Sequence, residues 1–483
     1  MIRGKGAAAL ALLALLGGCG DGGGSGGTGS SGGSTGAIGS TVPPIAPQPA
    51  TGCSLRERQD WVSAQMREWY LFPDTLPATL NPAGYSNVDD YLDALTATAR
   101  AQNKDRYFTY LTSIAEENAY FASGSSAGFG FRLATDGGQR IFLAEVFEGT
   151  AALNAGLDRG TEILAIGTDS RNLRTVSAII TAEGVDGVDT ALGDSIPGLT
   201  RVLRVSNGST TRDVTLTKTD YTLTPISSRY GAQVITDGGR KVGYVNLRTF
   251  ITPAEQSLRD AFADFRAQGA TDIIVDLRYN GGGLLSTAEV LGNLLGGARS
   301  RSDVFVYQTF RPEKSAENET RLFSPLTQSA TPTRIAFIGT HGTASASELV
   351  INAFIPYMHA NVGLIGTNTF GKPVGQIALD RAACDDRLRV IAFATENSAH
   401  QGAYYNGLAD TVEASCRADD DITHQMGSPQ ETMTRTALDY LAGRSCTRIA
   451  TGQSGQSLNA NRPRQLLSPL RPSAAQRETP GLF

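Results

Sequence analysis

Short apolar runs alternate with amphipathic stretches through the second half of this chain. Residues 253–268 place Leu258, Phe262 and Phe265 on one face, which predicts a helix packed against a core. The runs around and after it are apolar and rich in β-branched residues, and they predict buried strands at 242–247, 272–277, 334–338 and 362–365. A strand, a helix and a second strand in succession indicate a parallel pair, so this half of the chain is predicted to be an α/β domain.

Residues 53–118 show a helical pattern instead. Trp61, Met66 and Trp69 fit one face of an amphipathic helix. The group Tyr91-Leu92-Leu95 fits a second helix. Packing is a sufficient explanation for the aromatic residues, so no chemistry is assigned to this predicted helical region.

The chain begins with a short basic segment followed by an apolar one. Arg3 and Lys5 precede the apolar run 7–16, which is too short to span a bilayer as a helix. The next residues, Leu16-Gly-Gly-Cys19, resemble a bacterial lipobox. Residues 1–19 are therefore predicted to be a lipoprotein signal peptide, with Cys19 as the lipidated residue. An ordinary signal peptide that happens to contain a cysteine is the alternative.

Composition and charge narrow the class of protein. With 483 residues, 40% of them hydrophobic and 18% charged, the chain is long enough for two or three globular domains. Its net charge of −5 gives no electrostatic basis for nucleic-acid binding. Residues 20–52 are rich in Gly, Ser, Thr and then Pro, so they cannot bury a core and are predicted to form a flexible tether.

Four cysteines follow Cys19, namely Cys53, Cys384, Cys416 and Cys446. In an exported chain an even number predicts up to two disulfides, and three pairings are open. Free, buried cysteines are the alternative. None of the four has the short paired spacing of a zinc site, so no metal is predicted.

The segment 339–348, Gly-Thr-His-Gly-Thr-Ala-Ser-Ala-Ser-Glu, lies between a predicted strand and a run of helical character. It places a hydroxyl where a strand turns into a helix, next to free amides and the positive end of the helix dipole, which can stabilise an oxyanion. Ser345 followed by Glu348 also forms a capping box, which needs no chemistry. Two further motifs favour the catalytic interpretation: Asp276-Leu-Arg-Tyr-Asn-Gly-Gly-Gly283 and Thr369-Phe-Gly-Lys-Pro-Val-Gly-Gln376.

In this order, the three segments resemble the carboxy-terminal processing, or tail-specific, serine peptidases. That family carries a Ser nucleophile in a Ser-Ala-Ser-Glu context, a Lys general base in a Phe-Gly-Lys context, and an upstream Asp-Leu-Arg-x-Asn-x-Gly-Gly segment. The resemblance implies that Ser345 is the nucleophile and Lys372 the base. It extends more weakly from about Trp61 to Leu441 and implies a ClpP/crotonase-like catalytic fold.

Lys372 lies 27 residues after Ser345 (372 − 345), beyond a predicted helix and strand that can return the chain to the same end of the sheet. A lysine acts as a base near neutral pH only if burial or its neighbours lower its pKa. In some family members a Gln four residues later bonds this lysine, which here implies Gln376 and a Ser-Lys-Gln triad. Such a contact would require a local turn at Pro373 and Gly375, because four residues of strand span about 13 Å. An ordinary strand position is the alternative for Gln376.

Two other side chains compete for these roles. His341 is close to Ser345 in the sequence but has no assignable acidic partner, so a polar loop contact is predicted for it. Ser347 is a rival nucleophile, but the family pattern favours the first serine of the motif.

The predicted oxyanion hole consists of the Ala346 amide and one amide of the turn 281–283, with Gly282 and Gly283 as the candidates. Asp276 and Arg278 are predicted to pin that turn by an ion pair.

Residues 119–222 resemble a PDZ domain. The segment Ala127-Gly-Phe-Gly-Phe-Arg132 is similar to the carboxylate-binding loop of such domains, and residues 146–167 are similar to the strand, short helix and strand that follow. Gly160-Thr-Glu162 departs from the usual Gly-Asp. The residues that would bind a peptide tail, by adding it to an exposed strand edge, are Gly128, Phe129, Gly130 and Phe131. A Gly-rich hairpin that binds nothing is the alternative.

The predicted fold class is therefore α/β, with a ClpP/crotonase-like catalytic domain at 223–446 and a β-rich PDZ domain upstream. Residues 447–483 are rich in Pro, Arg, Ser and Gln and are predicted to be disordered.

The predicted function is that of a lipid-anchored, extracytoplasmic serine endopeptidase, in the periplasm or cell envelope, that needs no cofactor. Its expected partners are unfolded or tail-exposed protein substrates and, through Cys19, a membrane; an activating partner or a homo-oligomer stays open. The alternative function is a non-catalytic, peptide-binding scaffold lipoprotein, against which an intact Ser345, Lys372 and Gln376 argue. A hydrolase or lyase of the crotonase-like fold would not explain the PDZ segment.

Overall fold

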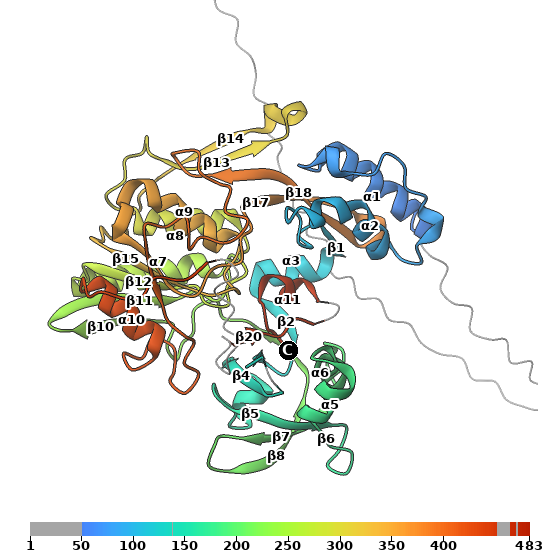
Figure 1. Cartoon of the computed structure of the whole chain (residues 1–483), viewed down its shortest axis with the longest axis horizontal. Helices are drawn as coiled ribbons and strands as arrows, with labels where there is room; N and C mark the ends of the chain where they lie inside the picture. Colours follow the sequence, from blue (N-terminus) through green and yellow to red (C-terminus); the bar gives the residue numbers. More distant parts are fainter. Residues whose placement is uncertain (1–50, 138, 452–463, 470–471) are drawn as a thin grey trace, which may run out of the picture. The chain divides into compact units, whose positions relative to one another are not determined.

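The computed structural model describes residues 51–137, 139–451, 464–469 and 472–483 (Figure 1). The predicted signal peptide with Cys19, and nearly all of the predicted tether, lie outside the described residues.

The α-helices are α1 (Leu55–Trp69), α2 (Val88–Ala101), α3 (Ile114–Ser123), α4 (Ala151–Asn154), α5 (Val176–Glu183), α6 (Asp186–Leu192), α7 (Ala254–Gln268), α8 (Leu285–Leu295), α9 (Ala346–Met358), α10 (Thr432–Leu441) and α11 (Ala474–Glu478). The strands of the first half are β1 (Tyr110–Ser113), β2 (Ser125–Gly128), β3 (Phe131–Thr135), β4 (Ile141–Val146), β5 (Glu162–Gly167), β6 (Arg174–Thr175), β7 (Thr200–Ser206), β8 (Thr211–Thr217) and β9 (Thr219–Thr222). Those of the second half are β10 (Ala232–Asp237), β11 (Arg240–Asn246), β12 (Asp272–Asp276), β13 (Val304–Phe310), β14 (Glu319–Leu322), β15 (Ile335–Gly339), β16 (Val362–Gly366), β17 (Val374–Arg381), β18 (Asp386–Glu396), β19 (Ala414–Arg417) and β20 (Gln465–Leu466).

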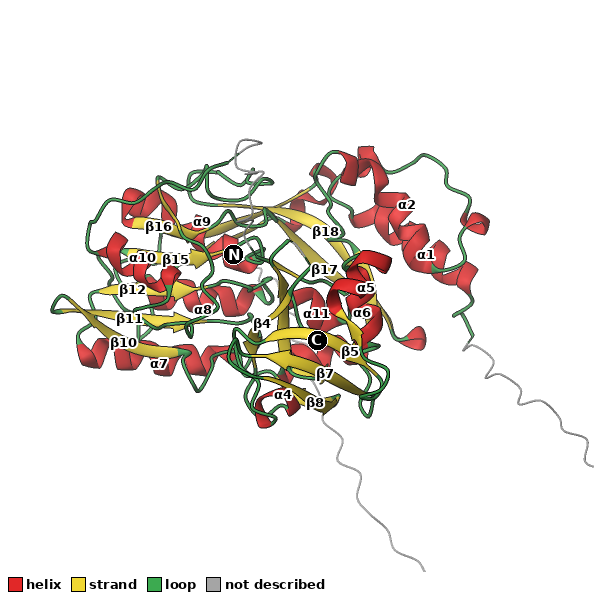
Figure 2. Ribbon diagram, turned by 60° about the horizontal axis from the view of Figure 1, so that its bottom comes forward, coloured by secondary structure: helices red, strands yellow, loops and turns green. Residues whose placement is uncertain are grey.

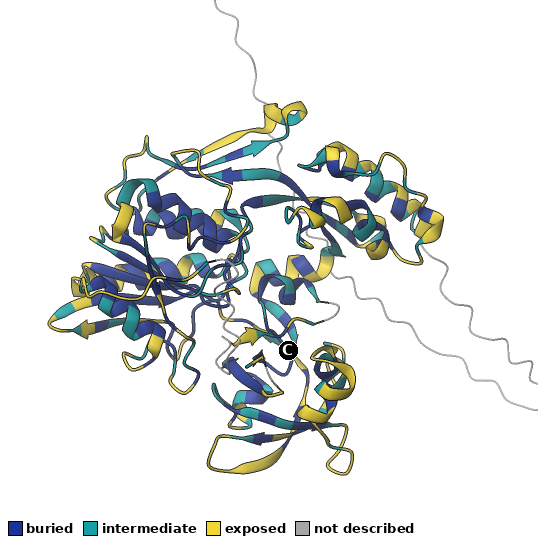
Figure 3. Cartoon of the chain, in the orientation of Figure 1, coloured by how far each residue is buried: buried dark blue, intermediate teal, exposed yellow. Residues whose placement is uncertain are grey.

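The second half of the chain is built on a sheet with the strand order β10-β11-β12-β15-β16-β19, in which only β10 runs antiparallel to its neighbour (Figure 2). Successive residues of β12 point to opposite faces, so Ile273 and Val275 join one core while Ile274 joins the other. Helices α7, α8 and α9 cover the first face and α10 covers the second. Figure 3 shows how completely α9 is buried in this arrangement. The predicted parallel α/β architecture is confirmed.

A second, antiparallel sheet has the order β1-β18-β13-β14, with β17 also paired to β18. Helices α1 and α2 form where the sequence predicts helices, and their apolar faces pack on this sheet through Met66, Leu92 and Val390. The same predicted helical region also contains a strand, β1, which the sequence pattern did not reveal. It pairs with β18 and so continues the sheet.

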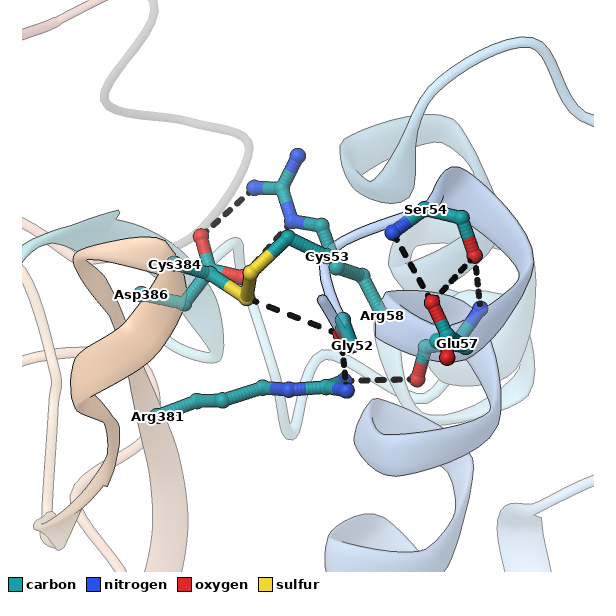
Figure 4. Close-up of a disulfide and its surroundings, with 8 residues drawn as sticks. All are labelled: Gly52, Cys53, Ser54, Glu57, Arg58, Arg381, Cys384 and Asp386. Carbon is teal, nitrogen blue, oxygen red and sulfur yellow. Dashed lines mark hydrogen bonds and ion pairs between the residues drawn. A yellow bond between two sulfur atoms is a disulfide. The ribbon is translucent and has the colours of Figure 1, made fainter. Parts of the chain in front are cut away.

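Two disulfides are present, Cys53–Cys384 and Cys416–Cys446. The first fastens the start of α1 to the β17–β18 connection, beside an ion pair between Arg58 and Asp386 (Figure 4).

Replacing Cys53 and Cys384 together with serine is expected to lower the free energy of unfolding by roughly 2–5 kcal/mol, because the crosslink restricts the unfolded chain. The measurement is urea unfolding followed by circular dichroism. The matched control is the Cys416 and Cys446 pair. Its residues are 30 apart in sequence rather than 331, so it closes a shorter loop and the loss should be smaller. An equal or larger loss for the control would contradict this account.

Residues 125–222 form a β-rich unit, to which β20 from near the end of the sequence is added. Its main sheet has the order β20-β3-β4-β5-β7-β8, with β6 on β5, and β2 and β9 form a separate pair. Helices α5 and α6 pack on the main sheet through Ile179 and Leu192. Strand β4, helix α4 and strand β5 follow one another as the sequence predicts for residues 146–167, although β4 begins earlier, at Ile141.

Two expectations about the end of the chain are wrong. The disordered tail predicted at 447–483 is ordered over its described residues: β20 pairs with β3, and α11 begins with a capping box at Ser473. Ser428 and Pro429 favour a helix over 429–441, with Ser428 as its cap and Pro429 at its first position, but the helix begins instead at Thr432. Glu431 is its N-cap and accepts hydrogen bonds from the next helical amides.

In the described part of the chain, no helix has the length and apolarity needed to cross a bilayer. The same residues contain no group of three or more His, Cys, Asp or Glu side chains arranged to hold a metal ion.

Candidate active site

Ser345 lies where the chain passes from β15 into α9. Its φ is 55°, a conformation rarely adopted by residues other than glycine and concentrated at functional sites. It borders a cavity of about 140 Å³. Side chains from distant parts of the sequence share this cavity, among them Phe121, Leu349, Lys372, Gln376, Arg389 and Glu478.

The structure brings Lys372 and Gln376 together. Lys372 Nζ donates to Gln376 Oε1 at 3.0 Å, and Gln376 Nε2 in turn donates to the carbonyl oxygen of Phe108. The local turn predicted at Pro373 and Gly375 is wrong: β17 begins at Val374, and a β-bulge lies between Gly375 and Gln376. Two long side chains span the remaining separation.

The environment of Lys372 lowers its pKa below the ordinary 10.5. Part of the side chain is accessible, but the ammonium group is enclosed, and this burial is the largest cause of the shift. Glu478 and Asp105 act in the opposite direction by attracting the charged form. The lowered pKa is the condition under which a lysine can accept a proton near neutral pH.

Glu348 connects the Ser345 turn to the segment that carries Lys372. Its buried carboxylate accepts hydrogen bonds from the amides of Ser345 at 3.1 Å, Gly371 at 2.7 Å and Lys372 at 2.7 Å. The predicted contact between Glu348 and the Ser345 amide is thus present, and the same carboxylate also fixes the backbone at Gly371 and Lys372.

The turn after β12 forms another wall of the cavity beside Ser345. The Gly282 amide donates to Asn280 Oδ1 at 2.9 Å, so it is already used. Within the described residues the amides of Gly283 and Ala346 have no protein acceptor, and both residues border the cavity beside Ser345. Of the two predicted glycine donors, Gly283 fits the oxyanion hole and Gly282 does not. Gly282 is needed for space, because a Cβ there would lie 2.8 Å from the Cβ of Ser345.

The rival side chains are placed elsewhere. Ser347 is fully buried, and its hydroxyl donates to the carbonyl oxygen of Asn280 at 3.1 Å. His341 is exposed and does not border the cavity. Its ring lies against Phe370 with centroids 5.0 Å apart, so the predicted polar contact is replaced by a ring contact.

Arg278 anchors the turn through a buried ion network. It contacts Asp276, as predicted, and also Glu431 and Asp420. Burial alone would raise the pKa of Asp420, but Arg159 and Arg278 outweigh it and lower that pKa to about 2. The predicted ion pair is confirmed as part of a larger cluster.

The loop of the β-rich unit predicted to bind peptides is occupied by the end of the sequence. The amides of Gly130 and Phe131 donate to the carbonyl oxygen of Phe483 at 3.1 and 3.4 Å. A Cβ on Gly128 would lie 2.7 Å from the Phe483 carbonyl carbon. Phe129 is buried beneath the loop, in the same apolar core as the Phe483 side chain.

Known proteins share these elements. Residues 241–401, which contain Ser345, Lys372 and Gln376, match peptidase family S41, and residues 57–110 match the N-terminal domain of that family. Residues 241–401 are a peptidase S41 domain. The chain is thus related to the carboxyl-terminal processing serine peptidases.

Curated proteins similar to this chain include carboxyl-terminal processing peptidases. A chloroplast C-terminal processing peptidase of Tetradesmus obliquus is 29% identical over 273 residues, covering 53% of this chain and 54% of the relative. A carboxyl-terminal-processing protease of Synechocystis is 27% identical over 303 residues, covering 61% and 63%. The chain thus spans about half to three-fifths of the length of these two relatives. An S41-type protein of Bacteroides fragilis shares the fold, with a TM-score of 0.60 and 23% identity over 79% of this chain and 97% of that one.

Several residues around the S41 site escaped sequence reasoning. Phe108 contributes only a backbone carbonyl, which no side-chain pattern can reveal. Arg389 lies within an ordinary-looking strand. Glu478 belongs to a tail whose composition suggested disorder. Glu348 alone carried a signal, since its place in the Ser-Ala-Ser-Glu motif was visible.

Proposed function

We propose that this chain is a serine endopeptidase with a Ser345–Lys372 mechanism, acting on proteins that it selects by their carboxyl tails. The observation that carries the proposal is the cavity shared by Ser345, the Lys372–Gln376 pair and the residues Ala346 and Gly283, whose amides have no protein acceptor in the described part of the chain. The S41 match over the same residues supports it.

In this mechanism Lys372 takes the proton of the Ser345 hydroxyl as the oxygen attacks the carbonyl carbon of the scissile bond. The amides of Ala346 and Gly283 stabilise the resulting oxyanion. Lys372 then gives the proton to the leaving amine, and the C–N bond breaks to leave an acyl-enzyme. A water molecule, deprotonated by Lys372, hydrolyses the ester and restores Ser345. Gln376 holds the amine in place, and no cofactor takes part.

Tail selection is assigned to the β-rich unit, acting as a PDZ domain. The support is the edge of β3 and the loop at Gly130, where the amides of Gly130 and Phe131 donate to a main-chain oxygen of Phe483. Addition of a peptide strand to such an edge gives affinity through main-chain hydrogen bonds, and a side-chain pocket gives specificity. The expected partners are unfolded proteins or proteins with exposed tails.

The proposal places the enzyme outside the cytoplasm, attached to a membrane through Cys19. The support is the basic and apolar start of the sequence, together with two disulfides, which persist in oxidising compartments.

The test is cleavage of an unfolded protein that ends in a free apolar residue, with Ser345→Ala, Lys372→Ala and His341→Ala compared with the unchanged chain. Loss of cleavage in the first two variants and retention in the third would support the mechanism. Cleavage that survives Lys372→Ala but fails in His341→Ala would move the base to His341. Tail binding without cleavage by any form would favour the scaffold function instead.

Ser347→Ala is expected to leave kcat/KM within a few-fold of the unchanged chain, whereas Ser345→Ala should lower it at least about 1,000-fold. The reason is that only Ser345 borders the cavity, while Ser347 bonds to a backbone carbonyl in the core. Thermal unfolding of both variants controls for structural damage. A comparable loss of activity in a well-folded Ser347→Ala chain would contradict the assignment of the nucleophile.

A further inference from the structure

The last residues of the sequence cover one edge of the β-rich unit. Strand β20 pairs antiparallel with the last two residues of β3. Further along the same edge, the Leu133 amide donates to the carbonyl oxygen of Gly481 at 2.8 Å, and the Phe483 amide donates to Phe131 at 2.9 Å. The chain therefore uses its own final segment as the added strand that a peptide ligand would supply.

The final residue enters a built pocket. The Phe483 carbonyl oxygen accepts from the amides of Gly130 and Phe131, while its ring is buried in the apolar core of the unit. Leu482 is buried as well, in a separate cluster with Tyr120 and other residues. A single short segment thus satisfies both the polar edge and the apolar pocket.

Helix α11 lies between β20 and this final segment and is braced against its surroundings. Gln476 Nε2 donates to the Leu482 carbonyl oxygen at 3.0 Å. The Thr479 and Tyr120 hydroxyls are 2.7 Å apart. The Arg477 guanidinium lies 4.2 Å from the centre of the Tyr110 ring. These contacts fix the helix as well as the final residues.

Helix α11 carries Glu478 to the active site. Glu478 borders the same cavity as Ser345 and Lys372, and a Cβ on Gly281 would lie 2.8 Å from its carbonyl oxygen. The remaining cavity of about 140 Å³ is well below the roughly 300–1,000 Å³ of typical ligand pockets. The Glu478 carboxylate also favours the protonated form of Lys372, because it raises the pKa of that amine.

Helix α11 does not place one of its own peptide bonds in position for cleavage. The amides of Arg477 and Thr479 donate to the carbonyl oxygens of Ser473 and Ala475, so the peptide groups of α11 bond within the tail. They are not extended toward the amides of the oxyanion hole. The tail therefore obstructs the cavity without offering a bond for cleavage.

Arg132 links the groove to the catalytic turn. Its buried Nη1 donates to the Pro480 carbonyl oxygen at 2.6 Å and to the Tyr279 carbonyl oxygen at 3.2 Å. Tyr279 lies between β12 and Gly283 in the sequence, and its φ is 65°. One guanidinium thus contacts both the bound tail and the turn of the active site.

We propose that residues 473–483 are a built-in competitive inhibitor. They fill the tail-binding groove and close the active-site cavity, until a substrate whose carboxyl tail ends in apolar residues displaces them. The groove accordingly takes an extended peptide with a small residue, leucine and an aromatic residue at its last three positions. This inference rests on the proposed peptidase function.

The test compares the full chain with a chain ending at Pro472, using an unfolded reporter protein that ends in Ala-Leu-Phe. We expect kcat/KM to rise at least about tenfold on truncation, because docking the substrate no longer requires the tail to leave. Ser345→Ala in both chains is the background control. Phe483→Glu tests the same point without shortening the chain, since a carboxylate cannot occupy the apolar pocket. Ser468→Glu, which adds the same charge at an exposed position of the tail, should change nothing.

A second measurement does not depend on cleavage. A fluorescent peptide with the sequence of residues 473–483 should bind the truncated chain, and binding to the full chain should be at least about tenfold weaker. Equal binding of the peptide to both chains would overturn the inference. So would a kcat/KM that stays unchanged or falls in both the truncated chain and Phe483→Glu. In either case the peptidase proposal would stand. Peptide binding to the truncated chain alone, with no cleavage by any form, would reject the peptidase proposal but keep the groove as the site of the tail.

Discussion

Lys372→Met is expected to abolish catalysis and to make the protein more stable at neutral pH. Loss of a general base typically lowers kcat about 100- to 10,000-fold. The gain in stability has a separate cause, because burial penalises the charged amine in the folded chain and methionine carries no charge to bury.

The sign of this effect follows from proton binding. The pKa of Lys372 is lower in the folded chain than its ordinary value of 10.5, so between these two pKa values the unfolded chain holds one more proton than the folded chain. The stability of the unchanged protein therefore increases with pH across that window. The advantage of Lys372→Met is full below the folded pKa and is lost as the pH approaches 10.5.

The measurement is urea unfolding of both chains at pH 7 and at pH 10, alongside kcat/KM for the reporter protein. Lys241→Met is the matched control, because Lys241 is exposed and lies outside the cavity. It should change neither activity nor the pH dependence of stability. An inactive Lys372→Met chain that is less stable than the unchanged protein at pH 7 would show that the lysine is not buried as a penalised charge.

The second large effect is expected at Arg278. Replacement by methionine leaves Asp276 and Glu431 buried without the cation that both contact at 2.8 to 3.0 Å. Removing one member of such a buried network typically costs roughly 3–5 kcal/mol. Activity should fall as well, because Arg278 fixes the turn that carries Gly283.

Urea unfolding and kcat/KM measure the two consequences of Arg278→Met. Arg204→Met is the control: Arg204 and Asp213 are both exposed and pair across the β7–β8 hairpin, so loss of Arg204 should have no measurable effect. Equal stability of the two variants would contradict the role given to the buried cluster.

The parallel strands β11, β12, β15 and β16 could be predicted from the sequence because they are short, apolar and β-branched, and α7 could be predicted from its apolar face. The antiparallel strands β13, β14, β17 and β18 were not predicted. Ser345 and Lys372 could be placed because each stands in a recognisable motif. The choice between Gly282 and Gly283 could not be predicted, since it depends on where the Asn280 side chain points. The contact of Gln376 with Lys372 was expected to require a local turn, but it occurs beside a β-bulge. The local sequence gives little indication of such a bulge.

The tail shows a different limit. Its Pro, Arg, Ser and Gln content is typical of disorder. Composition is an average over the segment, so it does not reveal the few residues that determine whether the tail is ordered. Leu482 and Phe483 are apolar and become buried only because another part of the chain provides a pocket. A segment of this kind carries no periodicity of its own, so its order comes from a tertiary contact.

The hydrogen bonds from Arg132 to both Pro480 and Tyr279 also make the groove and the active site thermodynamically interdependent. If the turn at Tyr279 is more stable when the groove is occupied than when it is empty, or the reverse, the difference is a coupling free energy between the groove and the active site. Such a coupling is reciprocal. If an occupied groove changes the affinity of a reversible ligand at Ser345 by some factor, that ligand must change the affinity of the groove for a peptide by the same factor. Two sites that share no ligand would then report on each other's occupancy.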